Sequence, residues 1–272
     1  MYIYWPMERY SPVKVATKNF GDALNPFIGE FFSGKKVINA NVNDSVTRDD
    51  TVYLVCGSSL TFAQMPTEVW GSAILTPRWN LKAIPKKVHA VRGPLTRKYL
   101  LDRGVKCPEV YGDPGLLCPM FFRPSSLEKK YTFGLIPHVV DKKIVSSWDL
   151  PEEVLVIDIE EDFQTIVDKL NSCKYILSSS LHGLILSDAY KLSSLYVTIS
   201  GVPIAKGKSF KFKDYFLSIG KDYYDPLLLT QDRFRNLSKI RRMCREYKLD
   251  IDLKKLVDAC PFNLKEIKYE QY

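Results

Sequence analysis

The ten residues Leu177-Ser-Ser-Ser-Leu-His-Gly-Leu-Ile-Leu186 bring three hydroxyl groups and one histidine to a point where a strand turns into a helix. Residues 174–177 form a short apolar run typical of a buried strand, and residues 184–190 have one apolar face at helical spacing. The three serines can cap this helix, and its first N–H groups together with the helix dipole favour an anion. We therefore predict an anion site with His182 beside it; the alternative is a capped helix with a packed imidazole.

Strand-like segments followed by small or polar residues recur along the chain. They are Thr51–Cys56 followed by Gly57, Lys87–Val91 followed by Arg92, Val110–Tyr111 followed by Gly112, Tyr131–Ile136 followed by Pro137, and Val154–Asp158 followed by a helix over 162–172. Strands that alternate with helices predict parallel sheets covered by helices, which is an α/β fold. The carboxyl ends of the strands form the functional edge of such a sheet, so we expect the site there.

Length and composition predict two domains. A chain of 272 residues with 46% hydrophobic content can bury a sizeable core. The polar, proline-containing segment Arg123–Lys130 is the predicted linker and divides the chain into domains 1–126 and 127–272. Two C-terminal helices are expected over residues 232–247 and 252–259.

Cysteine usage, hydropathy and charge predict a cytoplasmic protein with an anionic partner. The six cysteines form no C-x-x-C pair and no zinc-site spacing, so we expect buried thiols of a reducing compartment and no metal site. The first residues lack a signal-peptide pattern, and no apolar stretch reaches the length of a membrane span. The net charge of +8 favours anions, but the basic residues form no stripe with interleaved aromatic residues, so nucleic acid is not the expected partner.

The segment Asn19–Asn25 is a second candidate site. Gly21 permits a close backbone approach, Asp22 supplies a carboxylate, and Asn25 adds an amide. The alternative is a simple helix start in which Asp22 is the N-cap.

Other strand ends each carry one group able to bind an anion or exchange a proton. Arg92 can grip a carboxylate or phosphate through two hydrogen bonds, or it can pair with a neighbouring carboxylate. Asp113 and His138 are candidates for proton exchange, and their alternatives are a turn residue and a packed or surface imidazole. The basic segment 206–213 can close over an anion or form a solvated turn, whereas His89 lies within a strand and is expected to be structural.

Taken together and in order, these motifs resemble those of the polysaccharide pyruvyl transferase family. The matching segments are Asn19–Pro26, Cys56–Leu60, Trp70–Ser72, Val91–Thr96, Tyr111–Gly115, Ile136–His138, Ser178–Gly183 and Lys211–Tyr215. Each motif is short, and the specificity comes from eight of them occurring in the family's order.

The resemblance implies two Rossmann-like domains facing each other across a cleft, as in GT-B glycosyltransferases. It also implies phosphoenolpyruvate as the donor, release of phosphate, and a pyruvate ketal on a sugar of a polysaccharide or lipid-linked oligosaccharide, as in exopolysaccharide or capsule biosynthesis. In many members an arginine two positions before the family histidine helps to hold the donor. This chain has Ser180 at that position. Arg92 or the basic segment 206–213 is therefore expected to bind the phosphate instead.

With this resemblance, each candidate residue receives a role. His182 is expected to protonate the methylene carbon of phosphoenolpyruvate, and Asp22 to take the proton of the sugar hydroxyl, with Asp113 as the weaker candidate for that base. The donor-binding candidates are Arg92, Ser178, Ser179, Ser180, Gly183, His138, Lys208 and Lys211. The acceptor-binding candidates are Asn19, Gly21, Asn25 and Asp113. The chemistry requires neither a metal nor another cofactor.

Two other functions fit the residues. A glycosyltransferase of GT-B type would use a nucleotide sugar, and a non-catalytic protein would bind carbohydrate or nucleic acid without releasing phosphate. If the acceptor is lipid-linked, the basic protein is expected to lie at the inner face of the cell membrane, where anionic lipids attract positive charge.

Overall fold

The structure is a computed structural model of the 272-residue chain. It describes residues 1–6, 8–9, 15–16, 20–43, 46–47, 49–199, 209–244, 247 and 249–262. The chain forms two compact units. The first contains Met1–Leu117 together with helices α6 (Phe210–Ser218) and α8 (Leu253–Asp258), and the second runs from Cys118 through strand β11 (Ser193–Thr198) and includes helix α7 (Leu237–Met243).

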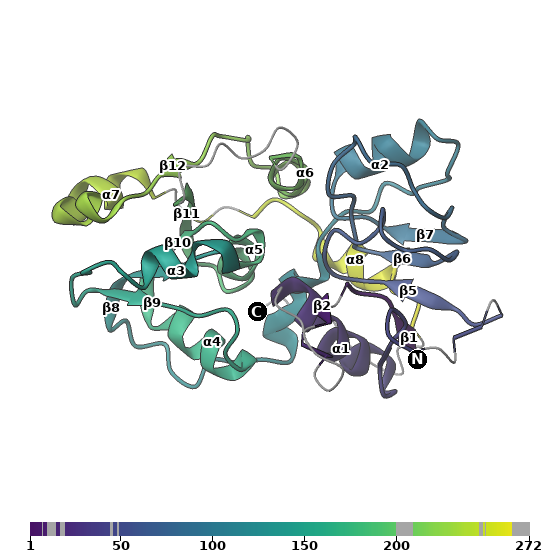
Figure 1. Ribbon diagram of the computed structural model, residues 1–272, viewed down its shortest axis with the longest axis horizontal. Coiled ribbons are helices and arrows are strands. Elements are labelled where there is room, and N and C mark those ends of the chain that lie inside the picture. The colour runs from purple at the N-terminus through teal and green to yellow at the C-terminus, as the bar shows by residue number, and fades with distance from the viewer. Residues whose placement is uncertain are drawn as a thin grey trace. The chain divides into compact units, whose positions relative to one another are not determined.

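The first unit is built on a parallel sheet of five short strands in the order β4-β1-β5-β6-β7 (Figure 1). The strands are β1 (Tyr2–Ile3), β4 (Ile38–Asn39), β5 (Val52–Leu54), β6 (Glu68–Trp70) and β7 (Lys87–Ala90). Helix α1 (Phe20–Ser33) lies between β1 and β4 in the chain, and helix α2 (Pro94–Leu101) follows β7. A separate antiparallel pair joins β2 (Glu8–Arg9) to β3 (Val15–Ala16).

Helix α1 contains a proline, and the residue before it compensates for the missing hydrogen bond. Pro26 has no N–H to donate to the carbonyl of Asp22, four residues earlier. The side-chain amide of Asn25 donates to that carbonyl oxygen instead, at 2.9 Å. The other end of the same side chain accepts from the backbone N–H of Cys56 at 2.9 Å, which fixes the start of α1 against the loop after β5.

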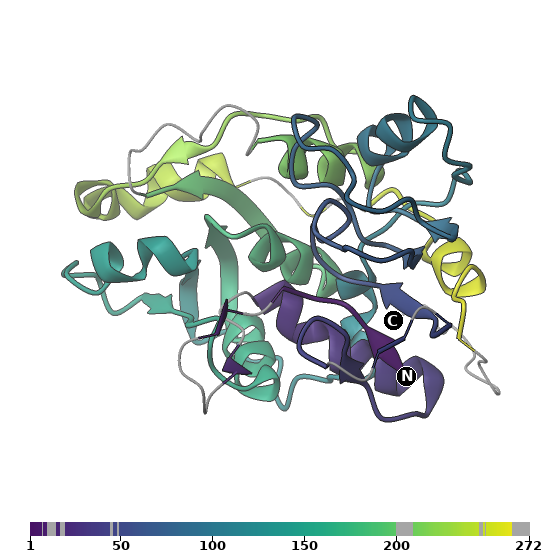
Figure 2. The same ribbon diagram turned by 45° about the vertical axis from the view of Figure 1, so that its right-hand side comes forward.

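The second unit contains a parallel sheet in the order β12-β11-β10-β8-β9, and Figure 2 shows its green and teal strands side by side. The remaining strands are β8 (Tyr131–Ile136), β9 (Val154–Val156), β10 (Cys173–Ser178) and β12 (Leu227–Leu228). The helices are η1 (Pro114–Met120), which spans the boundary between the units, η2 (Val139–Asp141), α3 (Lys142–Val145), α4 (Phe163–Asn171) and α5 (Leu181–Ala189). Helix α5 packs on β10 and β11, and α4 packs on β10.

The predicted α/β class is confirmed, because both sheets are parallel and helices lie between their strands in the chain. The predicted facing of two domains across a cleft stays a prediction, as does the division into 1–126 and 127–272. In the structure, α6 and α8 group with the first unit although they follow the second unit in the chain. One reason is the indole of Trp70, which donates to the carbonyl of Leu256 at 2.8 Å.

The segment predicted as a linker is bonded to a helix. The backbone N–H of Ser125 donates to the carboxylate of Asp168 at 2.6 Å, and the side-chain amide of Gln164 donates to the carbonyl of Arg123 at 2.8 Å. Both partners lie on α4. Polar composition alone did not reveal these bonds.

The predicted single helix over 232–247 is wrong. The chain forms a 3-10 helix, η3 (Gln231–Asn236), followed by α7. Asn236 interrupts the helix because its backbone leaves the helical region at φ −133° and ψ 75°, while its side chain accepts from the N–H of Lys239 and caps α7. Helices α4 and α8 lie where the sequence predicts them, capped by the carboxylates of Asp162 and Asp252.

Candidate active site

The carboxyl edge of the first sheet gathers several of the predicted site residues. Asp22 lies in the first turn of α1 and is buried, and Gly57 follows β5 with a positive φ of +96°. A Cβ on Gly57 would lie 2.9 Å from the Asp22 carboxylate, so the glycine permits the loop to approach this acid closely. Burial raises the pKa of Tyr4, and the charge of Asp22 adds to this shift.

Asn25 is buried beside Asp22, and Gly21 lies in the same turn of α1. The amide of Asn25 is used by contacts within the protein, because it donates to the carbonyls of Asp22 and Gly21 and accepts from Cys56. Its observed role is therefore to fix the helix start, and acceptor binding by this side chain stays a prediction.

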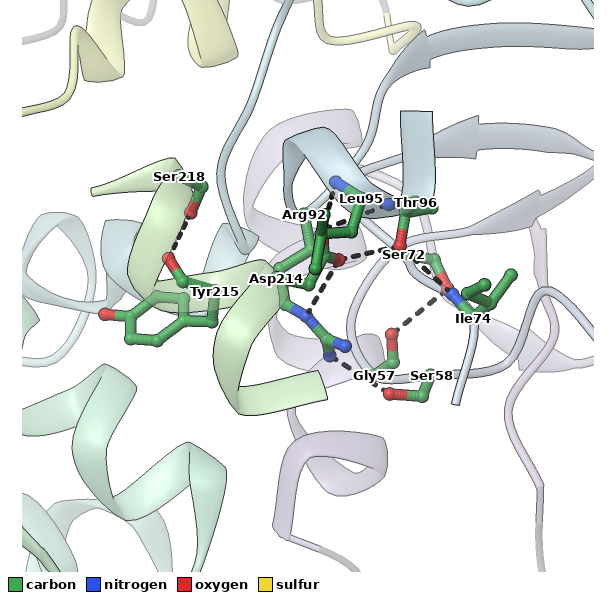
Figure 3. A network of polar contacts seen from close by, with 10 residues as sticks. All are labelled: Gly57, Ser58, Ser72, Ile74, Arg92, Leu95, Thr96, Asp214, Tyr215 and Ser218. Carbon is green, nitrogen blue, oxygen red and sulfur yellow. Dashed lines mark hydrogen bonds and ion pairs between the residues drawn. The ribbon is translucent and has the colours of Figure 1, made fainter. Parts of the chain in front are cut away.

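Arg92 is a fully buried guanidinium at the carboxyl end of β7 (Figure 3). Its Nη1 donates to the hydroxyl of Ser58 at 3.1 Å, and its Nε lies 3.9 Å from Oδ2 of Asp214. Among the residues that the structure describes, Nε and Nη2 have no hydrogen-bond partner. A guanidinium carries five N–H donors, and the bond to Ser58 is the one side-chain hydrogen bond that Arg92 makes among the described residues.

Two carboxylates, those of Asp214 and Asp113, act electrostatically on the Arg92 guanidinium. Burial lowers the pKa of Arg92, and the carboxylates of Asp214 and Asp113 oppose the shift, so the guanidinium stays charged. Burial raises the pKa of Asp214. The charge of Arg92 and hydrogen bonds from Thr96 and Leu95 oppose this shift. Asp214 was absent from the predicted site residues, although it lies in the matching segment Lys211–Tyr215.

Asp113 lies at the same sheet edge, after the isolated bridge between Val91 and Tyr111, and is fully buried. Its Oδ1 accepts from the N–H of Gly115 at 3.0 Å and from the thiol of Cys56 at 3.3 Å. The predicted turn role is therefore observed, and the charge of Asp113 also acts on Arg92.

The serines of the second unit do not cap helix α5 as predicted. The N-cap is Ser180, whose side chain makes no capping bond. The hydroxyl of Ser178 contacts the carbonyl of Ile136 at 3.1 Å and the N–H of Ser180 at 3.1 Å instead. The Ser178 hydroxyl, which the sequence pattern places at the helix start, thus bonds to the neighbouring strand. The first turn of α5 has no hydroxyl cap.

Ser179 connects the loop after β8 to the loop after β10. Its hydroxyl accepts from the N–H of His138 at 2.8 Å and donates to the carboxylate of Asp141 at 2.7 Å. His138 is half-buried and caps η2, because its Nδ1 accepts from the N–H of Val140 at 3.4 Å. Asp141 was not predicted, since its bond to Ser179 spans 38 residues of sequence.

His182 lies in the first turn of α5 and is only 6% exposed. Gly183 next to it is required by packing, because a Cβ there would lie 2.3 Å from the Ser178 hydroxyl. The tight contact between α5 and the end of β10 fixes the histidine backbone at the carboxyl edge of the second sheet.

The remaining predicted residues are placed as follows. Lys211 lies in the first turn of α6, with its Nζ 5.2 Å from the centre of the Phe212 ring, so it belongs to a helix rather than to a loop. Asn19 and Lys208 lie outside the described residues. His89 is paired with Glu68 on the adjacent strand at 2.7 Å, as a structural residue.

Four of the six cysteines are buried: Cys56, Cys107, Cys118 and Cys173. Burial raises the pKa of Cys107 and of Cys173 to about 11, which keeps both thiols protonated at neutral pH. No group of three or more histidine, cysteine or acidic side chains in that part is arranged to hold a metal ion. None of its helices has both the length and the apolar character of a membrane span.

The first unit thus holds a buried guanidinium after one of its strands, and the second holds a histidine in the first turn of a helix. The family model for polysaccharide pyruvyl transferases matches residues 19–201. The chain therefore belongs to this family, as its motifs predicted.

Two relatives match most of the chain. The chain is 31% identical over 227 residues to the uncharacterized protein L143 of Acanthamoeba polyphaga mimivirus. The aligned region covers 80% of this chain and 77% of L143. The chain is 25% identical over 220 residues to the succinoglycan biosynthesis protein ExoV of Rhizobium meliloti. This aligned region covers 75% of the chain and 63% of ExoV. No solved structure matches the chain significantly.

Proposed function

We propose that the protein transfers pyruvate from phosphoenolpyruvate to two hydroxyls of one sugar, forming a ketal and releasing phosphate. The observation that carries the proposal is the buried guanidinium of Arg92, whose Nε and Nη2 find no hydrogen-bond partner among the described residues. Leaving such donors unsatisfied is costly, and a phosphate or carboxylate supplies the acceptors they need. Family membership supports phosphoenolpyruvate as this anion.

The chemistry starts with a proton at the methylene carbon of phosphoenolpyruvate, which makes C2 electrophilic. In the proposal His182 donates this proton, and a sugar hydroxyl attacks C2 while Asp22 takes the hydroxyl proton. The C2–O bond to phosphate then breaks with its electron pair leaving on the phosphate, and the second hydroxyl attacks C2 to close the ketal while its proton passes to the departing phosphate. Arg92 stabilises the negative charge of the donor throughout.

Each assigned group has a position suited to its role within its own unit. Asp22 is buried in a helix start that Asn25 holds against the loop after β5, so the carboxylate is held in a fixed place. His182 stands in a first helical turn that no serine hydroxyl caps, where a negative charge is favoured by the helix dipole. Within the first unit, we assign donor binding to Arg92.

The acceptor is proposed to be a sugar of a lipid-linked oligosaccharide, reached at an anionic membrane surface. Residues 69–101 include no acidic residue, and within this stretch the side chain of Trp79 is 46% exposed. An exposed tryptophan among basic residues suits the interface of an anionic bilayer. Co-sedimentation with phosphatidylglycerol vesicles but not with phosphatidylcholine vesicles is the expected result, and equal recovery with both would contradict this contact.

Thermal unfolding separates the proposal from its main rival, a glycosyltransferase. Phosphoenolpyruvate at about 100 times its Kd is expected to stabilise the folded protein by about 2.7 kcal/mol, because it binds only the folded state. A uridine diphosphate control should leave the melting temperature unchanged. Stabilisation by the nucleotide alone would favour the glycosyltransferase, and a non-catalytic protein would bind its ligand without consuming it.

A further inference from the structure

Asp214 caps a helix that lies far from it in sequence. The N-cap residue of α2 is Gly93, which has no side chain to offer. The Oδ1 of Asp214 accepts from the N–H of Leu95 at 2.9 Å and of Thr96 at 3.0 Å, and its Oδ2 accepts from the Thr96 hydroxyl at 2.7 Å (Figure 3). The carboxylate therefore replaces the missing cap with three hydrogen bonds.

The glycine at position 93 makes this arrangement possible. A Cβ there would lie 2.0 Å from the backbone oxygen of Asp214 and 2.5 Å from its Oδ1. The start of α2 and the middle of α6 thus touch through backbone atoms, and the fully buried Asp214 has one well-defined position.

The same carboxylate forms an ion pair with Arg92 but no hydrogen bond. The distance from Arg92 Nε to Asp214 Oδ2 is 3.9 Å, whereas a charge-assisted hydrogen bond measures about 2.7–2.9 Å. The oxygens of Asp214 accept their hydrogen bonds from α2, and the positive end of that helix stabilises the negative charge of the carboxylate. Arg92 is thus attracted toward Asp214 on one side and donates to Ser58 on the other.

We propose that Asp214 and Thr96 are positioning residues that keep Arg92 available to an anion. The Thr96 hydroxyl and the α2 amides donate hydrogen bonds to the Asp214 carboxylate. The carboxylate therefore orients the guanidinium by its charge but accepts no hydrogen bond from it. A carboxylate released from Thr96 would move the short distance to Arg92 and compete with the ligand. The inference rests on the proposed function only in taking phosphoenolpyruvate as the physiological anion.

The test compares Thr96→Val with Thr96→Ser. Valine has nearly the same shape but lacks the hydroxyl, so Oδ2 of Asp214 is left to pair with Arg92, whereas serine keeps the hydroxyl. We expect Thr96→Val to raise the Kd of inorganic phosphate and the KM for phosphoenolpyruvate by about tenfold with kcat little changed, in proportion to one charge-assisted hydrogen bond. Thr96→Ser should stay within about twofold of the parent protein.

A purely structural cap gives a different result. In that case Thr96→Val lowers the melting temperature, but the folded protein binds phosphate as the parent does, and this outcome overturns the inference. Equal losses in Thr96→Ser and Thr96→Val would overturn it as well. If Thr96→Val does not fold, Thr96→Ala removes the same hydroxyl with a smaller side chain, and unchanged phosphate binding in folded Thr96→Ala would overturn the inference.

The phosphate probe also separates this inference from the proposed function. Phosphate binding that depends on the Thr96 hydroxyl, without turnover of phosphoenolpyruvate, supports the positioning role and contradicts the pyruvyl transfer. Turnover with the parent KM in folded Thr96→Val supports the transfer and contradicts the positioning role. If the parent protein binds neither phosphate nor phosphoenolpyruvate, both are wrong.

Discussion

Arg92→Lys is expected to weaken phosphoenolpyruvate binding by about 10- to 150-fold, because lysine keeps the charge but loses the planar fork of donors. A hydrogen bond between charged groups contributes about 1.5–3 kcal/mol, and every 1.4 kcal/mol changes Kd about tenfold. The buried carboxylate of Asp214 retains a counter-charge in this variant, so the protein should still fold. Calorimetric titration with phosphoenolpyruvate measures the change.

A matched control is Arg97→Lys. Arg97 lies on α2 and its Nε donates to the carbonyl of Cys107 at 3.2 Å, away from the assigned donor contacts. This variant should bind phosphoenolpyruvate like the parent protein. Arg92→Gln, in contrast, should cost about 3–5 kcal/mol of unfolding free energy, because it leaves buried acidic groups without their cation. Unchanged donor affinity in folded Arg92→Lys would remove Arg92 from the site.

His182→Gln is expected to lower kcat by about 10²–10⁴-fold, the usual contribution of a general acid. Glutamine retains a polar side chain at the start of α5, so the buried position remains filled and the Kd for phosphoenolpyruvate should change little. Quenched-flow or steady-state phosphate release gives kcat, and calorimetry gives the binding constant separately.

His89→Gln is the control for this second substitution. His89 is bonded to Glu68 on the neighbouring strand and has no assigned role in the reaction, so its loss should leave kcat unchanged. Near-normal turnover in folded His182→Gln would show that another group supplies the proton. A loss confined to phosphoenolpyruvate affinity would instead assign His182 to donor binding.

Local patterns predicted the parts of the fold that local chemistry determines. Short apolar runs ending in small residues identified the strands β5, β7, β8 and β10, and acidic N-caps identified α4 and α8. The same local reasoning failed at the serines before α5, because Ser178 bonds to Ile136 on an adjacent strand, 42 residues away in the chain. It failed for 232–247 because one asparagine side chain caps a new helix within an otherwise helical pattern.

The environment of Arg92 shows what the sequence alone does not reveal. Both an anion grip and a pairing with a carboxylate fitted the motif Val91–Thr96. The structure supplies the partner, Asp214, 118 residues beyond Thr96, and places its charge near Arg92 without a hydrogen bond. Glycine at the N-cap of α2 was the available signal, because a helix start without a capping side chain requires a cap from elsewhere.

Release of inorganic phosphate from phosphoenolpyruvate tests the central claim most directly. The parent protein is incubated with phosphoenolpyruvate and a panel of galactose-, mannose- and glucose-containing acceptors, and the sugar product is examined by mass spectrometry. The proposed function predicts phosphate release that depends on one class of acceptor and one pyruvate ketal formed for each phosphate released. Acceptor-independent release, or saturable binding of phosphoenolpyruvate with no ketal formed on any acceptor, would contradict it.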